Sequence, residues 1–376
     1  MYLNDFGGYK MDISTYTMLL TCKLMSLAFC YHDGGVKDKE KNLNETQRQW
    51  QVVDLPTVLE YASFVFYCNA CALGVFIEFS EYKRFIEMKG EYKNIPNTII
   101  PTLKNIAYGM LCFTLYVLGT FYFPFGYCFT EEYDKELMWY KIFYLYMAFT
   151  LRRFFYHCAF QLTTAANVSC GLGYNGVTEK GEHRWDKYIG IYTLACETTI
   201  SINEFLRDWN NRVHKWLKHY VMERLNKPGE RPSASSQAVV FIVSAFWHGF
   251  YPCYYLAFFM ALLLTEVSKD LYKSWILFAG IPKPVRLVLS HFLTMLVINY
   301  GLGVQMAITG ENTLNYLKNT RYCILIALVG TLILIKASGI VRIAQKMQKK
   351  KEGDKSTDKK VDPSAKGNQQ KREKIE

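Results

Sequence analysis

The sequence predicts an all-α protein that spans a membrane several times. Hydrophobic residues make up 51% of the chain and aromatic residues 16%. Many of them gather in runs of about 20 residues, the length that a helix needs to cross a bilayer. Trp, Tyr, Lys and Arg crowd the ends of many runs, as interfacial anchors do. Because lipid offers no partner to an exposed backbone, each run is expected to form a helix.

The mean hydropathy of the whole chain is only -0.01, so polar stretches must separate the apolar runs. Most runs lack the polar stripe that a helix of a soluble bundle would carry. The predicted spans are residues 13–31, 59–79, 106–125, 138–160, 238–264, 285–306 and 322–341. Residues 1–341 are therefore predicted to form one polytopic membrane domain.

Residues 342–376 form a basic tail, with twelve Lys or Arg and six Asp or Glu. Its low complexity predicts disorder, and its charge predicts a cytosolic side under the positive-inside rule. A tail that directly follows a span indicates membrane headgroups rather than nucleic acid as its neighbour, so no nucleic-acid partner is expected.

Three polar stretches divide the predicted spans. Residues 32–56 are expected to be a loop with a glycosylation sequon at Asn44, and residues 81–105 are expected at the membrane interface. The stretch 171–236 is too aromatic for a linker. Within it, residues 203–221 carry apolar side chains at helical spacing and predict one amphipathic helix.

Eleven cysteines are present, and most lie in apolar runs, where Cys packs as a small hydrophobe. Cys68 and Cys71 form a CxxC, but no second pair accompanies them, and a zinc site needs four clustered ligands. The sequence therefore predicts no metal and no cofactor.

His248 is the first candidate for chemistry because it lies deep in an apolar run, followed by Gly249. A neutral His is suited to general-base catalysis near pH 7. The alternative is a His that donates one hydrogen bond between helices. Polar side chains inside a membrane segment usually face the bundle interior or a watered cavity.

Asn210 is the second candidate, on the predicted amphipathic helix. Its amide has the chemistry to donate to a carbonyl oxygen and stabilise charge that develops there; the alternative is a capping or bridging role. Lys23, Arg152 and Arg153 are cations within apolar runs. Two readings stay open for them: contact with a substrate anion, or an ion pair within the bundle. A base and an amide donor without an evident activated nucleophile suit direct transfer between two bound substrates.

These motifs resemble those of the membrane-bound O-acyltransferases. The resemblance rests on Trp209-Asn210-x-x-Val213-x-x-Trp216 and Ser244-Ala245-Phe246-Trp247-His248-Gly249. Further motifs are similar to the lysophospholipid acyltransferase branch, and some to the lysophosphatidylcholine acyltransferases. They are Gly171-Leu172-Gly173-Tyr174-Asn175-Gly176, Trp185-Asp186, Leu24-x-Ser26-Leu27-Ala28-Phe29, Asn97-x-Ile99-Ile100-Pro101 and Thr130-Glu131-Glu132-Tyr133-Asp134.

The resemblance implies a helical bundle around a transmembrane chamber, in which an acyl group passes from acyl-CoA to the free hydroxyl of a lysophospholipid. It implies that His248 is the catalytic base and Asn210 its partner. It places substrate-binding residues at Trp209, Trp247, Gly249, Tyr254, Trp185 and Asp186. A multi-pass protein of the endoplasmic reticulum membrane is expected, because Arg372 and Lys374, five and three places from the end, loosely resemble a dilysine retrieval signal. Homo-oligomerisation stays open.

The chain departs from the family pattern in two places. Cys253 stands where the family often has a second Gly before the Tyr of its His motif. Family members usually carry further spans before the segment where this chain begins, so the first spans are expected to be missing. Two alternatives stay open: the same fold acting on a protein or sterol acceptor, or a non-catalytic transporter or scaffold.

Overall fold

The computed structural model describes residues 14–67, 75–230 and 232–349, and most of these residues are helical. The one bridge of β type among them is isolated and joins Val177 to His183. The predicted all-α fold class is confirmed. Cys68 and Cys71 and residues 350–376 of the basic tail lie outside the described residues. Helix is present over residues 340–349, where the sequence had predicted the start of a disordered tail.

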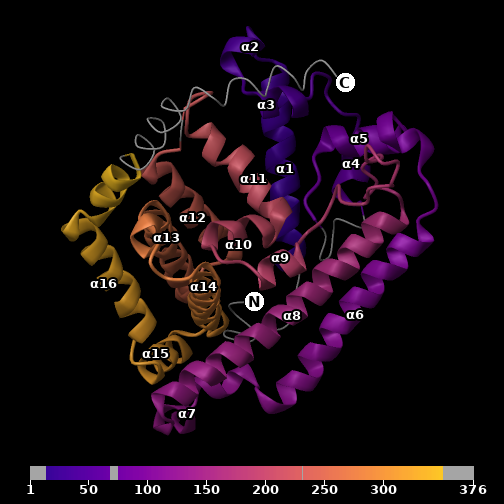
Figure 1. The fold of residues 1–376 in the computed structure, drawn as a ribbon. Helices are drawn as coiled ribbons and strands as arrows, with labels where there is room; N and C mark the ends of the chain where they lie inside the picture. Colours follow the sequence, from indigo (N-terminus) through magenta and orange to yellow (C-terminus); the bar gives the residue numbers. More distant parts are fainter. Residues whose placement is uncertain (1–13, 68–74, 231, 350–376) are drawn as a thin grey trace, which may run out of the picture.

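Two long antiparallel helices, α6 (Ile99–Tyr122) and α8 (Met138–Ser169), pack side by side along one side of the molecule (Figure 1). The short elements η3 (Phe125–Phe129) and α7 (Glu131–Lys135) join them. Most of α6 faces outward with exposed Leu and Phe side chains. Such a surface suits lipid, since the bilayer core is as apolar as these side chains.

Among the described residues, helices α6 and α14 (Lys283–Met306) are each long and apolar enough to cross a membrane. Helices α15 (Gly310–Asn319) and α16 (Cys323–Ser338) count as a third candidate if this pair, bent by 74°, is one broken span. In the described residues the other predicted spans correspond to helices that are shorter, broken or more polar.

The predicted span over residues 59–79 is wrong. Helix α4 (Val58–Val65) ends early, the chain is extended before α5 (Phe79–Ile86), and residues 68–74 are not described. Arg212 satisfies the extended segment: its Nε donates to the Phe76 carbonyl at 3.0 Å, and its Nη2 donates to the buried Glu78 at 2.6 Å. A backbone carbonyl that would bond within a helix is thus paired across the fold.

The first helix, α1 (Ser14–Gly34), agrees with the predicted first span. Its buried Lys23 donates to the carbonyls of Phe64 and Val65, at 2.9 and 3.1 Å. Beyond it, the predicted loop at residues 32–56 contains α2 (Lys39–Asn42) and α3 (Glu45–Trp50), and the interfacial stretch contains η2 (Gly90–Asn94). Asn44 caps α3 and also donates to Glu223 at 3.0 Å.

Helix α9 (Thr193–Glu197) precedes the stretch that was predicted as one helix over residues 203–221. That prediction is wrong, because the stretch forms α10 (Ile202–Asp208) and α11 (Asn211–Tyr220), followed by η4 (Met222–Arg224). The break falls at Asn210, whose φ of 43° and ψ of 51° are left-handed. Asn adopts this conformation more readily than most residues.

The predicted span over residues 238–264 is also two helices, α12 (Ala234–His248) and α13 (Pro252–Lys273). Gly249 has a φ of 133° and a ψ of -169°, a backbone conformation essentially restricted to glycine. Pro252 then occupies the first turn of α13, where its missing N–H costs nothing. The break could not be predicted from the apolar run, because hydropathy carries no information on backbone conformation.

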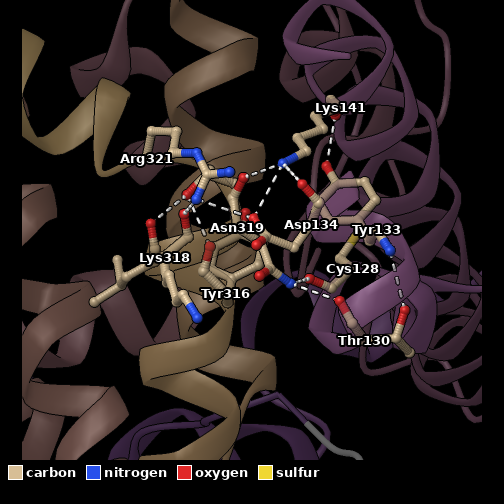
Figure 2. A network of polar contacts seen from close by, with 11 residues as sticks. Cys128, Thr130, Tyr133, Asp134, Lys141, Tyr316, Lys318, Asn319 and Arg321 are labelled. Atoms are coloured by element: carbon tan, nitrogen blue, oxygen red, sulfur yellow. Dashed lines mark hydrogen bonds and ion pairs between the residues drawn. The ribbon is translucent and has the colours of Figure 1, made fainter. Parts of the chain in front are cut away.

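A polar network fixes the corner between α15 and α16 against α7 and α8 (Figure 2). Buried Lys141 donates to the carbonyls of Asp134 and Asn319, at 2.7 and 2.8 Å. Asn319 donates in turn to the carbonyls of Cys128 and Thr130. The left-handed turn that separates the two helices is therefore held by hydrogen bonds that a lipid-facing turn would lack. A short helix, η5 (Trp275–Phe278), completes the described fold between α13 and α14.

Candidate active site

A cavity of about 510 Å³ lies among helices α10 to α14, with one contribution from α8. Figure 1 shows these helices grouped around the centre of the molecule. Both His248 and Asn210 line this cavity, although 38 positions separate them in the sequence. The structure thus contains the shared chamber that the sequence predicted for these two residues. Their catalytic roles remain a prediction.

His248 is the last residue of α12, at the point where the chain turns through Gly249. Its ring packs against Phe258, with centroids 5.2 Å apart, and against Tyr254 at 5.8 Å. In the described part of the chain its imidazole makes no hydrogen bond. The alternative of a structural bond between helices therefore has no support, and the ring nitrogens stay available to a ligand.

Asn210 is the N-cap of α11, but its side chain makes no capping hydrogen bond. Its backbone carbonyl accepts from the His214 N–H at 3.0 Å, and the next residue, Asn211, donates its N–H to the Gly190 carbonyl at 2.7 Å. The backbone therefore holds the left-handed turn, and the amide of Asn210 is left free to meet a substrate.

Trp209 lines the cavity next to Asn210 and is surrounded by aromatic rings. It stacks on Phe205, with centroids 5.4 Å apart and planes at 17°. The edges of Tyr156 and His157 on α8 meet it at 5.8 and 5.7 Å. Such ring pairs contribute about 0.5–1.5 kcal/mol each beyond the burial of apolar area. The Trp209 side chain therefore helps to hold the turn at Asn210.

The lining of the chamber includes the polar side chains of Gln237 and Lys269. Lys269 donates to Gln237 and to Glu266, and we call this region the polar end of the chamber. Gln237 and His248 both lie on α12 eleven residues apart (248 − 237), which places His248 roughly 16 Å along the helix from the polar end at 1.5 Å per residue. The wall between them is mainly apolar, with Val240, Phe241, Leu264 and Leu302.

The other residues predicted to contact substrate are divided between two places. Trp247 lines the chamber and donates its indole N–H to the Met18 carbonyl at 3.0 Å. Gly249 and Tyr254 adjoin His248 without lining the cavity themselves. Trp185 and Asp186 do not line it either.

Asp186 belongs to the loop that follows α8, where it accepts from Asn175 at 2.8 Å and from Arg184 at 2.9 Å. Partial burial opposes its charge, but these two hydrogen bonds outweigh burial and hold the pKa of Asp186 below its usual value. Trp185 packs on Tyr174 in the same loop. The pair therefore supports the glycine-rich loop.

Sequence reasoning had left the partners of the embedded arginines open. Arg153 lines the chamber but is paired with Glu197 on α9 and with Asn299 on α14. Arg152 lies over the rings of Phe125 and Phe155. Both cations thus find partners within the bundle.

Polar chamber residues that sequence reasoning missed are Asn203, His214, Gln237, Thr265, Lys269 and Gln305. Spacing gave no direct signal for them, since each is a single polar residue within a mixed or apolar helix. Within the described residues, no group of three His, Cys, Asp or Glu gathers as a metal site would require.

Comparison with known proteins shows the family of the chain. The family model of the membrane-bound O-acyltransferases matches residues 1–306. The chain belongs to this family. Proteins that are similar to this membrane-bound O-acyltransferase include the lysophospholipid acyltransferase of Saccharomyces cerevisiae, which is 29% identical over 71% of this chain. Lysophospholipid acyltransferase 2 of Arabidopsis thaliana is 30% identical over 88% of it. The human membrane-bound glycerophospholipid O-acyltransferase 2 is 29% identical over 89% of it.

These relatives are longer than this membrane-bound O-acyltransferase. The matched regions span 47% of the yeast protein, 71% of the Arabidopsis protein and 66% of the human protein.

Proposed function

We propose that this protein is a lysophospholipid acyltransferase that uses acyl-CoA as donor, with lysophosphatidylcholine and related lysolipids as acceptors. The observation that carries the proposal is the single chamber lined by His248 and Asn210. A fold shared with a family does not establish a reaction, but an imidazole and an amide that line one cavity, without side-chain partners among the described residues, supply what acyl transfer needs. The names of the similar proteins support lysophospholipid as the acceptor.

In the proposed reaction the His248 imidazole removes the proton from the free hydroxyl of the lysophospholipid. The alkoxide oxygen forms a bond to the thioester carbonyl carbon, and the carbonyl oxygen becomes negative. The Asn210 amide donates a hydrogen bond to that oxygen, a kind of contact worth about 10²–10³-fold in rate. The carbon–sulfur bond then breaks, and His248 returns its proton to the CoA thiolate.

The lining of the chamber suits substrates with polar and apolar parts. Its apolar residues would contact acyl chains, and Lys269 at the polar end, where it is paired with Glu266, would face the phosphates of the donor. A thioester beside His248 would then lie roughly 16 Å from that end, as the rise along α12 requires. The donor is expected to span this distance.

We place the protein in the endoplasmic reticulum membrane as a multi-pass protein. The outward apolar face of α6 and the candidate span α14 support membrane insertion. Reticular staining of a tagged full chain tests this address, and staining confined to another membrane would contradict it.

The function is tested with microsomes that express the chain and receive a panel of lysophospholipids and radiolabelled acyl-CoAs. Formation of labelled diacyl phospholipid is expected, with the His248→Ala variant at equal expression as the control. Transfer of label to protein or sterol instead would establish a different acceptor. Equal label in wild type and in the control would exclude this chamber as the catalytic site.

A further inference from the structure

A buried polar network at the chamber wall joins α8, α9 and α14. The Arg153 guanidinium donates to both carboxylate oxygens of Glu197, at 2.9 Å from Nε and 2.8 Å from Nη2. It also donates to the side-chain carbonyl of Asn299. His157 lies one turn after Arg153, and its Nε2 is 2.8 Å from the same Glu197 carboxylate. Arg153 and His157 are both buried, at 1% and 0% exposure.

The arrangement fixes which ring nitrogen of His157 carries the proton. An ionised carboxylate only accepts hydrogen bonds, and two charge-assisted bonds from Arg153 favour the ionised form of Glu197. Nε2 of His157 must therefore be the donor. Its other nitrogen, Nδ1, is buried and has no partner among the described residues. The Glu197 bond is thus the polar contact that orients the ring.

The oriented His157 ring packs against the chamber wall. His157 meets Trp209 at 70° with centroids 5.7 Å apart, and Trp209 is the residue just before Asn210. Trp209 also stacks on Phe205. Because Trp209 directly precedes Asn210, a shift of the His157 ring would reach the left-handed turn at Asn210 through Trp209.

We infer that Glu197 and His157 are positioning residues, which hold Trp209 and so aim the Asn210 amide into the chamber. This inference rests on the proposed function, because it assigns the network to the group that would stabilise the reacting oxygen. A network that served stability alone would not have to contact Trp209. A displacement of about 1 Å is enough to cost about 10²-fold in rate, so the support behind the wall has a large effect on turnover.

The test is a double-mutant cycle on radiolabelled acyl transfer by the full chain in microsomes. Glu197→Gln removes the charge, and His157→Ala removes the ring while Glu197 keeps both bonds from Arg153. Each variant is expected to lower kcat about 10- to 100-fold at nearly unchanged KM for the lysophospholipid. In the Asn210→Gly background, the same substitutions are expected to change kcat less than about 2-fold, because the group they position is gone.

The matched control is Asp33→Asn. Asp33 is buried and accepts two hydrogen bonds from Arg224, at 2.6 and 2.5 Å. This pair does not contact Trp209. Whatever Asp33→Asn costs in kcat is expected to be the same factor in both backgrounds. If Glu197→Gln and His157→Ala also cost the same factor in both backgrounds, or if neither lowers kcat, the positioning role is overturned.

Hydrogen–deuterium exchange separates this inference from the proposed function. Both variants are expected to raise exchange in the segment around residues 209–214 more than elsewhere. If the wild type transfers no acyl group, the proposed function fails, and local exchange still tests whether the network holds the turn. Uniformly raised exchange, or no change at residues 209–214, would refute the positioning role. If Glu197→Gln does not fold, His157→Ala carries both measurements.

Discussion

Replacing Asn210 by glycine and by alanine separates the role of its amide from the role of its backbone. Both substitutions remove the donor that we assign to the reacting oxygen. Only alanine is strained in the left-handed conformation that the structure gives to this residue, with a φ of 43°. Glycine adopts it freely.

The expected sizes follow from these two differences. Loss of one such donor lowers kcat about 10²–10³-fold, or roughly 2.7–4 kcal/mol of transition-state stabilisation. This loss should be the same in both variants. Alanine in the left-handed region costs about 1–2 kcal/mol of folding stability, so Asn210→Ala should also unfold at a lower temperature than Asn210→Gly.

Acyl transfer in microsomes and thermal unfolding of the detergent-purified protein measure the two effects. Asn211→Ala is the control, since Asn211 donates to the Arg207 carbonyl at 2.9 Å and does not line the chamber. It should cost about 1 kcal/mol of stability and little turnover. Turnover of Asn210→Gly within about 3-fold of the wild type would refute the role of the amide, since loss of such a donor costs far more.

Three further changes test other parts of the structure. His248→Ala should lower turnover about 10²–10⁴-fold, as loss of a general base does, without loss of membrane insertion; near-normal turnover would contradict the assignment. Lys269→Met should raise KM for acyl-CoA more than it lowers kcat in steady-state assays, because the cation lies at the polar end of the chamber and not beside His248; a loss confined to kcat would remove Lys269 from donor binding. Gly303→Ala should lower thermal stability, because its Cβ would lie 2.3 Å from the Tyr316 hydroxyl and 2.9 Å from Phe149; an unchanged unfolding temperature would show that α14 and α15 adjust.

The sequence predicted helix positions well wherever apolar length alone decides them. The span predicted at residues 285–306 became α14 (Lys283–Met306), with a start only two residues earlier. It failed where one residue breaks a helix or a distant residue replaces helical bonding. The left-handed Asn210 divides the predicted amphipathic helix, and Gly249 divides a continuous apolar run. Arg212 bonds to an extended segment more than 130 positions earlier in the chain, a pairing that no local pattern can indicate.

The candidate site was predictable in its centre and not in its surroundings. His248 and Asn210 could be found because a buried base and an amide carry distinctive chemistry and matched a known motif pair. The supporting residue Glu197 lies on a five-residue helix and owes its role to contacts from α8. Trp185 and Asp186 matched family motifs, yet in the fold they support a loop. Support of this kind depends on three-dimensional neighbours, and a single sequence does not specify them.

The two helix breaks also orient electric dipoles around the chamber. Helix α11 begins directly after Asn210, and helix α12 ends at His248. The first end carries partial positive charge and the second partial negative charge. Under the proposed reaction, negative charge develops on the oxygen beside Asn210 while His248 becomes cationic, so both dipoles oppose the cost of separating these charges. Each end contributes about 0.3–1 kcal/mol, and up to about 2 kcal/mol where water is largely excluded. If the helices ran through Asn210 and His248 without a break, both charges would lie beside the middle of a helix. The dipole effect is confined to the first and last turns, so it would not stabilise them there.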